Sequence, residues 1–177
     1  KISYRRLKYQ TPNQDGLQYV SGLLLLPASK PKGIILFFHS TISGKLNVPS
    51  LHFKEYKAEM LASIFAANGY IVVAPDYIGL GDNYAAMHPY ILYPLPNVED
   101  GKNILLAAVK YLQQNKLIDV KKTQLPLFVS GYSEGASYAL WFSRVYQSDF
   151  EFRSTLLKQK LILHKTVAIE GAYNLSG

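Results

Sequence analysis

The stretch LPLFVSGYSEGA, residues 125–136, decides the fold of this chain. It begins with an apolar run typical of a buried strand, and a helix-like segment follows it. Between the two lies a Gly-x-Ser-x-Gly pattern formed by Gly131, Ser133 and Gly135. On a tight turn from strand to helix, small residues let the two elements pass closely while the serine Oγ projects outward. The stretch therefore predicts a nucleophile elbow at Ser133.

The residue after this serine adds a second element of the same chemistry. The backbone N–H of Glu134 is expected beside Oγ at the N-terminus of a helix, where partial positive charge favours an oxyanion. The bare pattern occurs in many loops, so the strand before it and the helix after it carry the prediction.

The composition indicates a single globular domain over residues 1–177. Hydrophobic residues make up 49% and charged residues 18%, which is typical of a packed α/β protein and excludes disorder. The net charge is +7, but the lysines are scattered, so we predict no nucleic-acid partner. The absence of cysteine excludes a disulfide framework and a thiolate metal site. No apolar run reaches about 18 residues, so no integral membrane segment is predicted.

Strand-like and helix-like segments alternate along the chain. Residues 2–10 and 17–26 predict an antiparallel hairpin, with Asp15 and Gly16 in its turn. Further strands are expected at residues 33–38, 70–74, 125–129 and 166–170, and helices at 54–68, 99–116 and 134–147. This order predicts an α/β fold with a mostly parallel sheet and a leading antiparallel hairpin. Ligands bind such sheets beyond the carboxyl ends of the strands, where residues 39–53, 76–97, Ser133 and 170–177 are expected to meet.

Three further stretches belong with the elbow. They are Ser21-Gly22-Leu23-Leu24, His39-Ser40-Thr41, and residues 75–82 with the following His88-Pro89-Tyr90. Together with residues 131–135 they make the chain resemble an α/β-hydrolase of the secreted lipase and esterase branch, which includes the fungal lipase A type and related bacterial lipases. The resemblance covers nearly the whole chain. It implies a serine carboxylic-ester hydrolase that needs no metal or organic cofactor and is secreted or periplasmic.

The resemblance also implies residue roles. Ser133 would attack a small-molecule or lipid ester and form an acyl-enzyme, with Gly131 and Gly135 as the elbow glycines. The backbone N–H groups of Thr41 and Glu134 would form the oxyanion hole.

Other residues near this edge have structural interpretations. In this family the counterpart of His39 is structural, and Asp76 is expected to hydrogen-bond the turn after its strand rather than to act as the triad acid. The tyrosines of the long loop either wall an acyl or leaving-group pocket or hold the loop together; they are Tyr77, Tyr84, Tyr90 and Tyr93.

The rest of the triad is not evident in the sequence. In this fold the acid and the histidine follow the serine in that order, but residues 134–177 hold one predicted strand. His164 is expected to precede that strand, at the opposite end of the sheet from Ser133, whereas His52 and His88 lie in loops on the correct side. Glu170 is either the acid or a structural carboxylate. We therefore expect an N-terminal part of a hydrolase, with a C-terminal remainder on the same or another chain.

Two other functions stay open. A serine peptidase or an acyltransferase on the same fold would share the elbow chemistry and differ in the pocket and the acceptor. A catalytically inactive, hydrolase-like binding protein would fit if the chain were complete.

Overall fold

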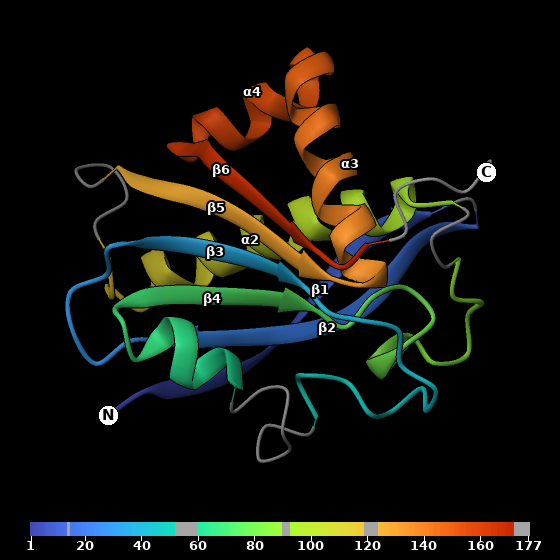
Figure 1. Ribbon diagram of the computed structural model, residues 1–177, viewed down its shortest axis with the longest axis horizontal. Helices are drawn as coiled ribbons and strands as arrows, with labels where there is room; N and C mark the ends of the chain where they lie inside the picture. The colour runs from blue at the N-terminus through green and yellow to red at the C-terminus, as the bar shows by residue number, and fades with distance from the viewer. Residues whose placement is uncertain (14, 52–59, 90–92, 119–123, 172–177) are drawn as a thin grey trace.

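The protein is built on a six-stranded sheet in the order β1-β2-β4-β3-β5-β6 (Figure 1). The structure, a computed structural model, describes residues 1–13, 15–51, 60–89, 93–118 and 124–171. The strands are β1 (Ser3–Asn13), β2 (Gly16–Leu26), β3 (Gly33–Phe38), β4 (Tyr70–Pro75), β5 (Leu125–Tyr132) and β6 (Leu161–Ile169). The pairs β1–β2 and β2–β4 are antiparallel, and β4, β3, β5 and β6 run parallel. The predicted mostly parallel sheet with a leading antiparallel hairpin is confirmed.

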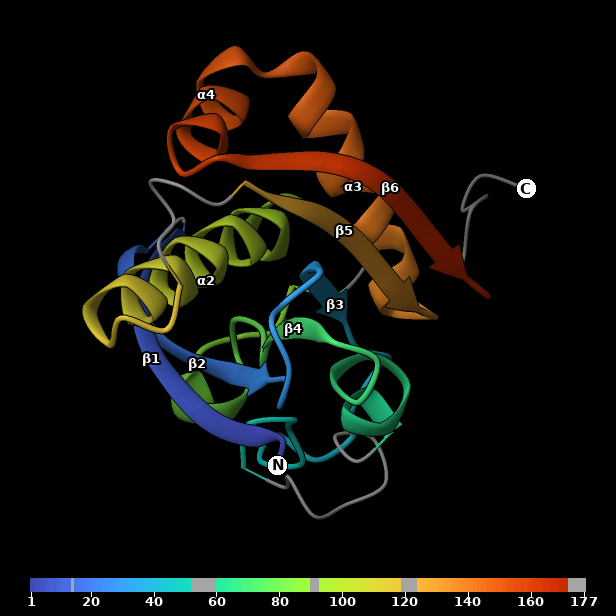
Figure 2. The ribbon, with the colours of Figure 1, turned by 90° about the vertical axis from the view of Figure 1, so that its left-hand side faces the viewer.

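Helical elements cover both faces of the sheet. In β3, Leu36 and Phe38 pack into the larger apolar core, which also holds residues of α2 (Leu95–Gln114) and α3 (Glu134–Ser148). The alternate residues of β3 pack against a smaller core beside the π-helical turn η1 (Ala62–Ala66). Figure 2 shows α2 and η1 on opposite sides of the strands. Burial on both faces explains why the sequence of β3 is continuously apolar.

The hairpin and the segment before β4 follow the sequence closely. Asn13 pairs with Gly16, whose φ of 102° is accessible mainly to glycine. The helix expected at residues 54–68 is described only from Met60 onward, and residues 54–59 lie outside the described part of the chain. It ends before Gly69, which has φ 93°.

The helix expected at residues 99–116 starts earlier than predicted. Helix α2 already begins at Leu95, with Pro96 in its first turn, so the acidic residues expected in that turn lie further along the helix. Proline is tolerated there because its missing N–H has no partner inside the helix.

The region after α3 holds an element that the sequence did not predict. Helix α4 (Phe150–Lys158) is capped at its N-terminus by Asp149, whose side chain accepts a hydrogen bond from the Phe152 N–H at 3.0 Å. Strand β6 then pairs with the whole of β5, from Leu161 onward.

The expectation that His164 precedes its strand is wrong. His164 lies inside β6, where a register shift leaves it between Leu163, which pairs with Leu127, and Lys165, which pairs with Phe128. Such a bulge interrupts the alternation of side chains, which is why the sequence pattern missed the first half of the strand. The pairing still places His164 far along the sheet from Ser133, which follows the Tyr132–Ile169 pair.

Candidate active site

Ser133 occupies the junction between β5 and α3. It has φ 55° and ψ −117°, a conformation that residues with a side chain rarely adopt, and its side chain is half-buried. Its N–H donates to the Ile169 carbonyl at 2.9 Å, and its carbonyl accepts from the Ala136 N–H at 3.0 Å. The turn is therefore held on both sides, by β6 and by the first turn of α3.

Both elbow glycines lie where a side chain would collide with backbone. A Cβ on Gly131 would come within 2.0 Å of the Gly135 carbonyl oxygen. A Cβ on Gly135 would come within 2.1 Å of the Phe38 carbonyl oxygen. The start of α3 therefore packs directly on β5 and on the end of β3, and this contact requires glycine at both positions.

The loop after β3 passes beside the elbow. His39 is buried, and its Nδ1 lies 2.7 Å from the Ser40 carbonyl while its ring stacks on Tyr77 with centroids 3.9 Å apart. Tyr77, in turn, donates its hydroxyl to the His39 carbonyl at 2.7 Å. These contacts fix the backbone that leads to Thr41, whose own side chain is exposed.

Glu134 places a buried carboxylate directly behind the candidate nucleophile. Its Oε1 lies 2.8 Å from His88 Nε2 and 2.5 Å from the Tyr138 hydroxyl. Burial raises the pKa of Glu134, but the hydrogen bonds from His88 and Tyr138, the His88 charge and the nearby Thr41 hydroxyl together lower it. Within the described residues, no group meets Oε2 at hydrogen-bonding distance and angle. Thr41 and Glu134, the two predicted oxyanion donors, thus lie close together.

The histidines described near the elbow are turned toward other groups. Besides its contact with Glu134, His88 directs Nδ1 at the Ile78 carbonyl, 2.8 Å away. His39 Nε2 lies 3.3 Å from the Asp76 carbonyl. His52 lies outside the described residues. In these four contacts, the ring nitrogens of His39 and His88 face groups other than Ser133.

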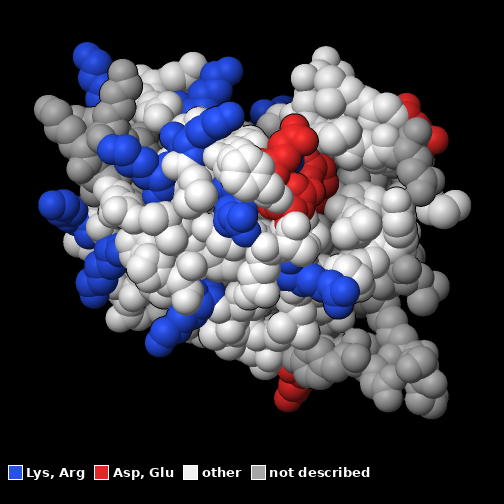
Figure 3. Space-filling view, turned by 90° about the horizontal axis from the view of Figure 1, so that it is seen from above, with Lys and Arg blue, Asp and Glu red and all other residues white. Residues whose placement is uncertain are grey.

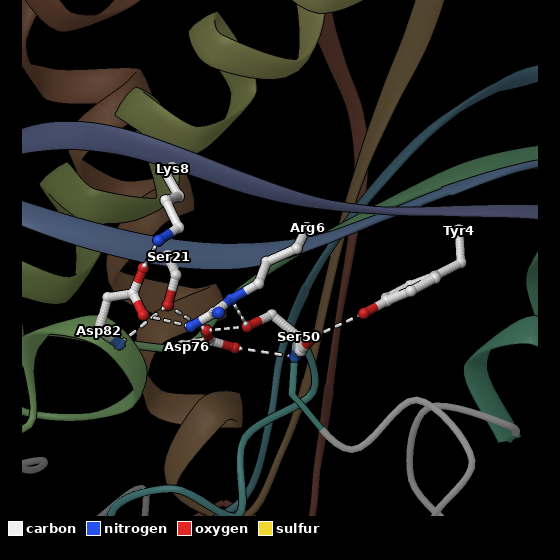
Figure 4. A network of polar contacts seen from close by, with 7 residues as sticks. All are labelled: Tyr4, Arg6, Lys8, Ser21, Ser50, Asp76 and Asp82. Carbon is white, nitrogen blue, oxygen red and sulfur yellow. Dashed lines mark hydrogen bonds and ion pairs between the residues drawn. The ribbon is translucent and has the colours of Figure 1, made fainter.

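Asp76 anchors the loop after β3 to the hairpin (Figure 4). It is fully buried and accepts hydrogen bonds from the Ser21 hydroxyl at 2.6 Å, from the Ser50 N–H at 3.1 Å and from the Ser50 hydroxyl. Burial raises the pKa of Asp76, against the hydrogen bonds of Ser21 and Ser50 and the nearby Arg6 charge. Arg6 also bonds Ser50 and Asp82. Asp76 therefore faces this network of serines and arginine. No motif in the sequence marks Arg6 or Ser50 as members of it.

Glu170 lies immediately after β6, next to the elbow. Its Oε2 accepts a hydrogen bond from the Tyr132 hydroxyl at 2.8 Å, and this bond, with the charge of Glu170, raises the pKa of the exposed Tyr132. The carboxylate of Glu170 thus contacts Tyr132, the neighbour of Ser133, in this hydrogen bond.

An apolar cavity of about 270 Å³ opens at the same edge. It is lined by Phe37, His39, Ser40, Pro49, Met60, Leu61 and Tyr132. The described tyrosines of the long loop, Tyr77, Tyr84 and Tyr93, are not part of this lining. Tyr77 is fully buried, whereas Tyr84 and Tyr93 are exposed, and Tyr90 lies outside the described residues.

The described part of the chain also bears on whether the protein has a metal site, a membrane-spanning helix or a basic surface. It contains no group of three His, Cys, Asp or Glu residues arranged to hold a metal ion. None of the helices in that part has both the length and the apolar character to cross a membrane. Figure 3 shows Lys and Arg side chains spread over one face, with uncharged surface between most of them. The absence of a nucleic-acid partner stays a prediction.

The sheet order, the tight turn between β5 and α3 and the crossovers are those of a partial α/β-hydrolase fold. The chain matches no protein-family profile and no curated protein sequence. It is similar to solved structures, among them the rice cell wall degrading esterase LipA from Xanthomonas oryzae, with 26% identity and a TM-score of 0.81 over 98% of this chain and 43% of LipA.

Two other solved structures share the fold. A presumed hydrolase from Legionella pneumophila is 26% identical, with a TM-score of 0.77 over 98% of this chain and 44% of that one. Candida antarctica lipase A in its closed state is 13% identical, with a TM-score of 0.55 over 94% of this chain and 37% of the lipase, and this likeness concerns the fold alone. The chain thus spans less than half the length of each of these proteins.

Proposed function

We propose that this protein is a serine carboxylic-ester hydrolase, a lipase or esterase, in which Ser133 is the nucleophile. The observation that carries the proposal is the backbone of Ser133, held at φ 55° and ψ −117° between β5 and α3. Such a conformation costs about 1–3 kcal/mol and is retained where it serves a function, here the exposure of a nucleophile. The similarity to the esterase LipA supports an ester as the substrate.

The reaction would proceed through an acyl-enzyme. Ser133 Oγ attacks the ester carbonyl carbon and loses its proton to a base, and the carbonyl oxygen becomes an oxyanion. The backbone N–H groups of Glu134 and Thr41 would bind that oxyanion; removing one such donor typically costs about 3 kcal/mol. Collapse of the intermediate releases the alcohol, and water then attacks the acyl group and frees Ser133.

We place the catalytic base outside the described residues. His39 and His88 direct their ring nitrogens at other partners, and His164 lies inside β6. The base would be His52 or a histidine in a remainder of the protein on the same or another chain, and the acid could come from the same remainder. Glu170 remains a candidate acid because it follows β6 beside the elbow.

The apolar part of the ester would enter the cavity beside Tyr132. At about 270 Å³ the cavity is larger than the roughly 150 Å³ that holds a benzene ring and smaller than most drug-sized pockets, so it suits a short apolar group. Its lining by Met60, Leu61 and Phe37 favours a hydrocarbon group over a charged one.

The test is covalent labelling and turnover of the full-length protein. We expect a fluorophosphonate probe to add one adduct at Ser133 and short nitrophenyl esters to be hydrolysed, and both to be lost in Ser133→Ala. Ser148→Ala, an exposed serine at the end of α3, is the matched control and should keep both. Binding of an ester without turnover or adduct would identify an inactive binding protein, and faster cleavage of amides would identify a peptidase.

The similarity to LipA also bears on where this protein acts in relation to the cell. LipA is a cell wall degrading esterase, so its substrate lies outside the producing cell. We propose that this protein likewise acts in a secreted or periplasmic form, which fractionation of the expressing cells would test.

A further inference from the structure

A buried pair, His88 and Glu134, lies behind the elbow and has no role in the reaction steps above. The two side chains are almost fully buried, at 4% and 3% exposed. His88 comes from the long loop after β4, and Glu134 is the first residue of α3, next to Ser133. The contact between Nε2 and Oε1, 2.8 Å, therefore joins two segments 46 residues apart.

Hydrogen-bond partners fix the number of protons in this pair. His88 Nδ1 faces a carbonyl oxygen, that of Ile78, which only accepts, so Nδ1 carries a proton. Nε2 faces the Glu134 carboxyl group, and one further proton lies between them, on the ring or on the acid. In both arrangements the pair is neutral as a unit. The Tyr138 hydroxyl, which also donates to Oε1, favours the carboxylate form of Glu134.

Neutrality matters because of where Glu134 sits. Its own N–H is a proposed oxyanion donor, and the helix N-terminus there favours negative charge on the substrate. An uncompensated carboxylate on the same residue would repel the oxyanion at short range. The proton shared with His88 removes that repulsion.

The same pair is tied to the other proposed donor. The ring of His88 stacks on Tyr77, with centroids 5.7 Å apart and planes 7° apart, and Tyr77 stacks on His39 on the other side. Tyr77 has φ 80°, which is strained for a bulky side chain, and its hydroxyl bonds the His39 carbonyl. Through these contacts, Glu134 is linked to the backbone that carries Thr41.

We propose that His88 and Glu134 are positioning residues. His88 neutralises the carboxylate of Glu134, and the pair holds the backbone N–H groups of Glu134 and Thr41 in place as oxyanion donors. The inference rests on the proposed function, since an oxyanion forms only if Ser133 reacts. It assigns His88 a role in stabilising the transition state and none as the base.

Three variants of the full-length protein test the charge argument. His88→Gln keeps a donor toward Glu134 but removes the proton that neutralises it, and we expect kcat to fall about 10- to 100-fold with KM nearly unchanged. Glu134→Gln keeps the pair neutral and should lower kcat no more than about fivefold. The double variant should regain most of the activity lost in His88→Gln. His164→Gln, in β6, is the matched control and should retain wild-type kcat.

Different failures have different meanings. If the wild type neither turns over esters nor labels at Ser133, the proposed function fails and the inference falls with it. If the wild type is active but the double variant is no better than His88→Gln, the pair is merely structural and the inference alone is wrong. Nitrogen-15 NMR spectra of the histidine rings in the wild-type protein test the proton count without any substrate, so this test does not depend on whether the variants fold. An unprotonated Nδ1 on His88 would overturn the inference.

Discussion

Replacing Ser133 by glycine and by alanine separates backbone strain from chemistry. Both changes remove the nucleophile, so both should abolish ester hydrolysis. The Ser133 side chain makes no capping hydrogen bond in the structure, so loss of the hydroxyl itself should alter stability little. Only glycine also removes the Cβ that makes φ 55° and ψ −117° unfavourable.

The expected difference in the free energy of unfolding follows from two opposing contributions. Relief of the strain is worth about 1–3 kcal/mol. The greater freedom of glycine in the unfolded chain takes back about 0.4–1 kcal/mol. Ser133→Gly should therefore be more stable than Ser133→Ala by up to about 2.6 kcal/mol, or up to about 10 °C in Tm for a domain of this size.

Urea and thermal unfolding of the two variants, followed by circular dichroism, measure this difference. Ala107→Gly, in the middle of α2, is the matched control, because alanine to glycine in an ordinary helix should cost about 1 kcal/mol. A glycine variant at position 133 that is less stable than the alanine variant would refute the argument that the elbow backbone is strained.

Three further changes test the packing, a buried acid and the cavity. Gly135→Ala should prevent folding or cost more than about 3 kcal/mol in chemical unfolding, because its Cβ would meet the Phe38 carbonyl oxygen. Burial raises the pKa of Asp100 to about 8, although the Tyr9 hydroxyl bonds it. The folded state thus keeps a proton that the unfolded carboxyl releases above about pH 4, so the free energy of unfolding should fall as the pH rises from about 4 to about 8. Asp100→Asn should make that slope shallower by the contribution of this one group, while the raised pKa of Asp76 keeps its own contribution. Met60→Trp should lower kcat/KM for longer acyl or alcohol groups more than for acetates, whereas Met87→Trp, on an exposed residue outside the cavity lining, should not.

The sequence predicted best where neighbours along the chain decide the structure. The continuous apolar run of β3 requires burial on both faces, and the Asp15-Gly16 turn requires positive φ, so both elements could be recognised locally. The strand-to-helix turn at Ser133 is of the same kind, since strand, turn and helix are adjacent in sequence. Where a local pattern was interrupted, as at the bulge around His164, prediction failed although the strand is real.

Local sequence patterns were sufficient to predict most of the strands and helices, although not α4, and to predict the position of the candidate nucleophile and the need for small residues beside it. Only the tertiary structure decided which distant groups meet there. His88 hydrogen-bonds Glu134, which is 46 positions away in the sequence. Asp76 hydrogen-bonds Ser21 and Ser50, which are 55 and 26 positions away. Such pairs leave no periodic or local signal, because each residue looks like an ordinary polar loop or strand residue until the chain folds. Burial then requires each to find a partner, and the sheet edge where the loops converge determines which partner it finds.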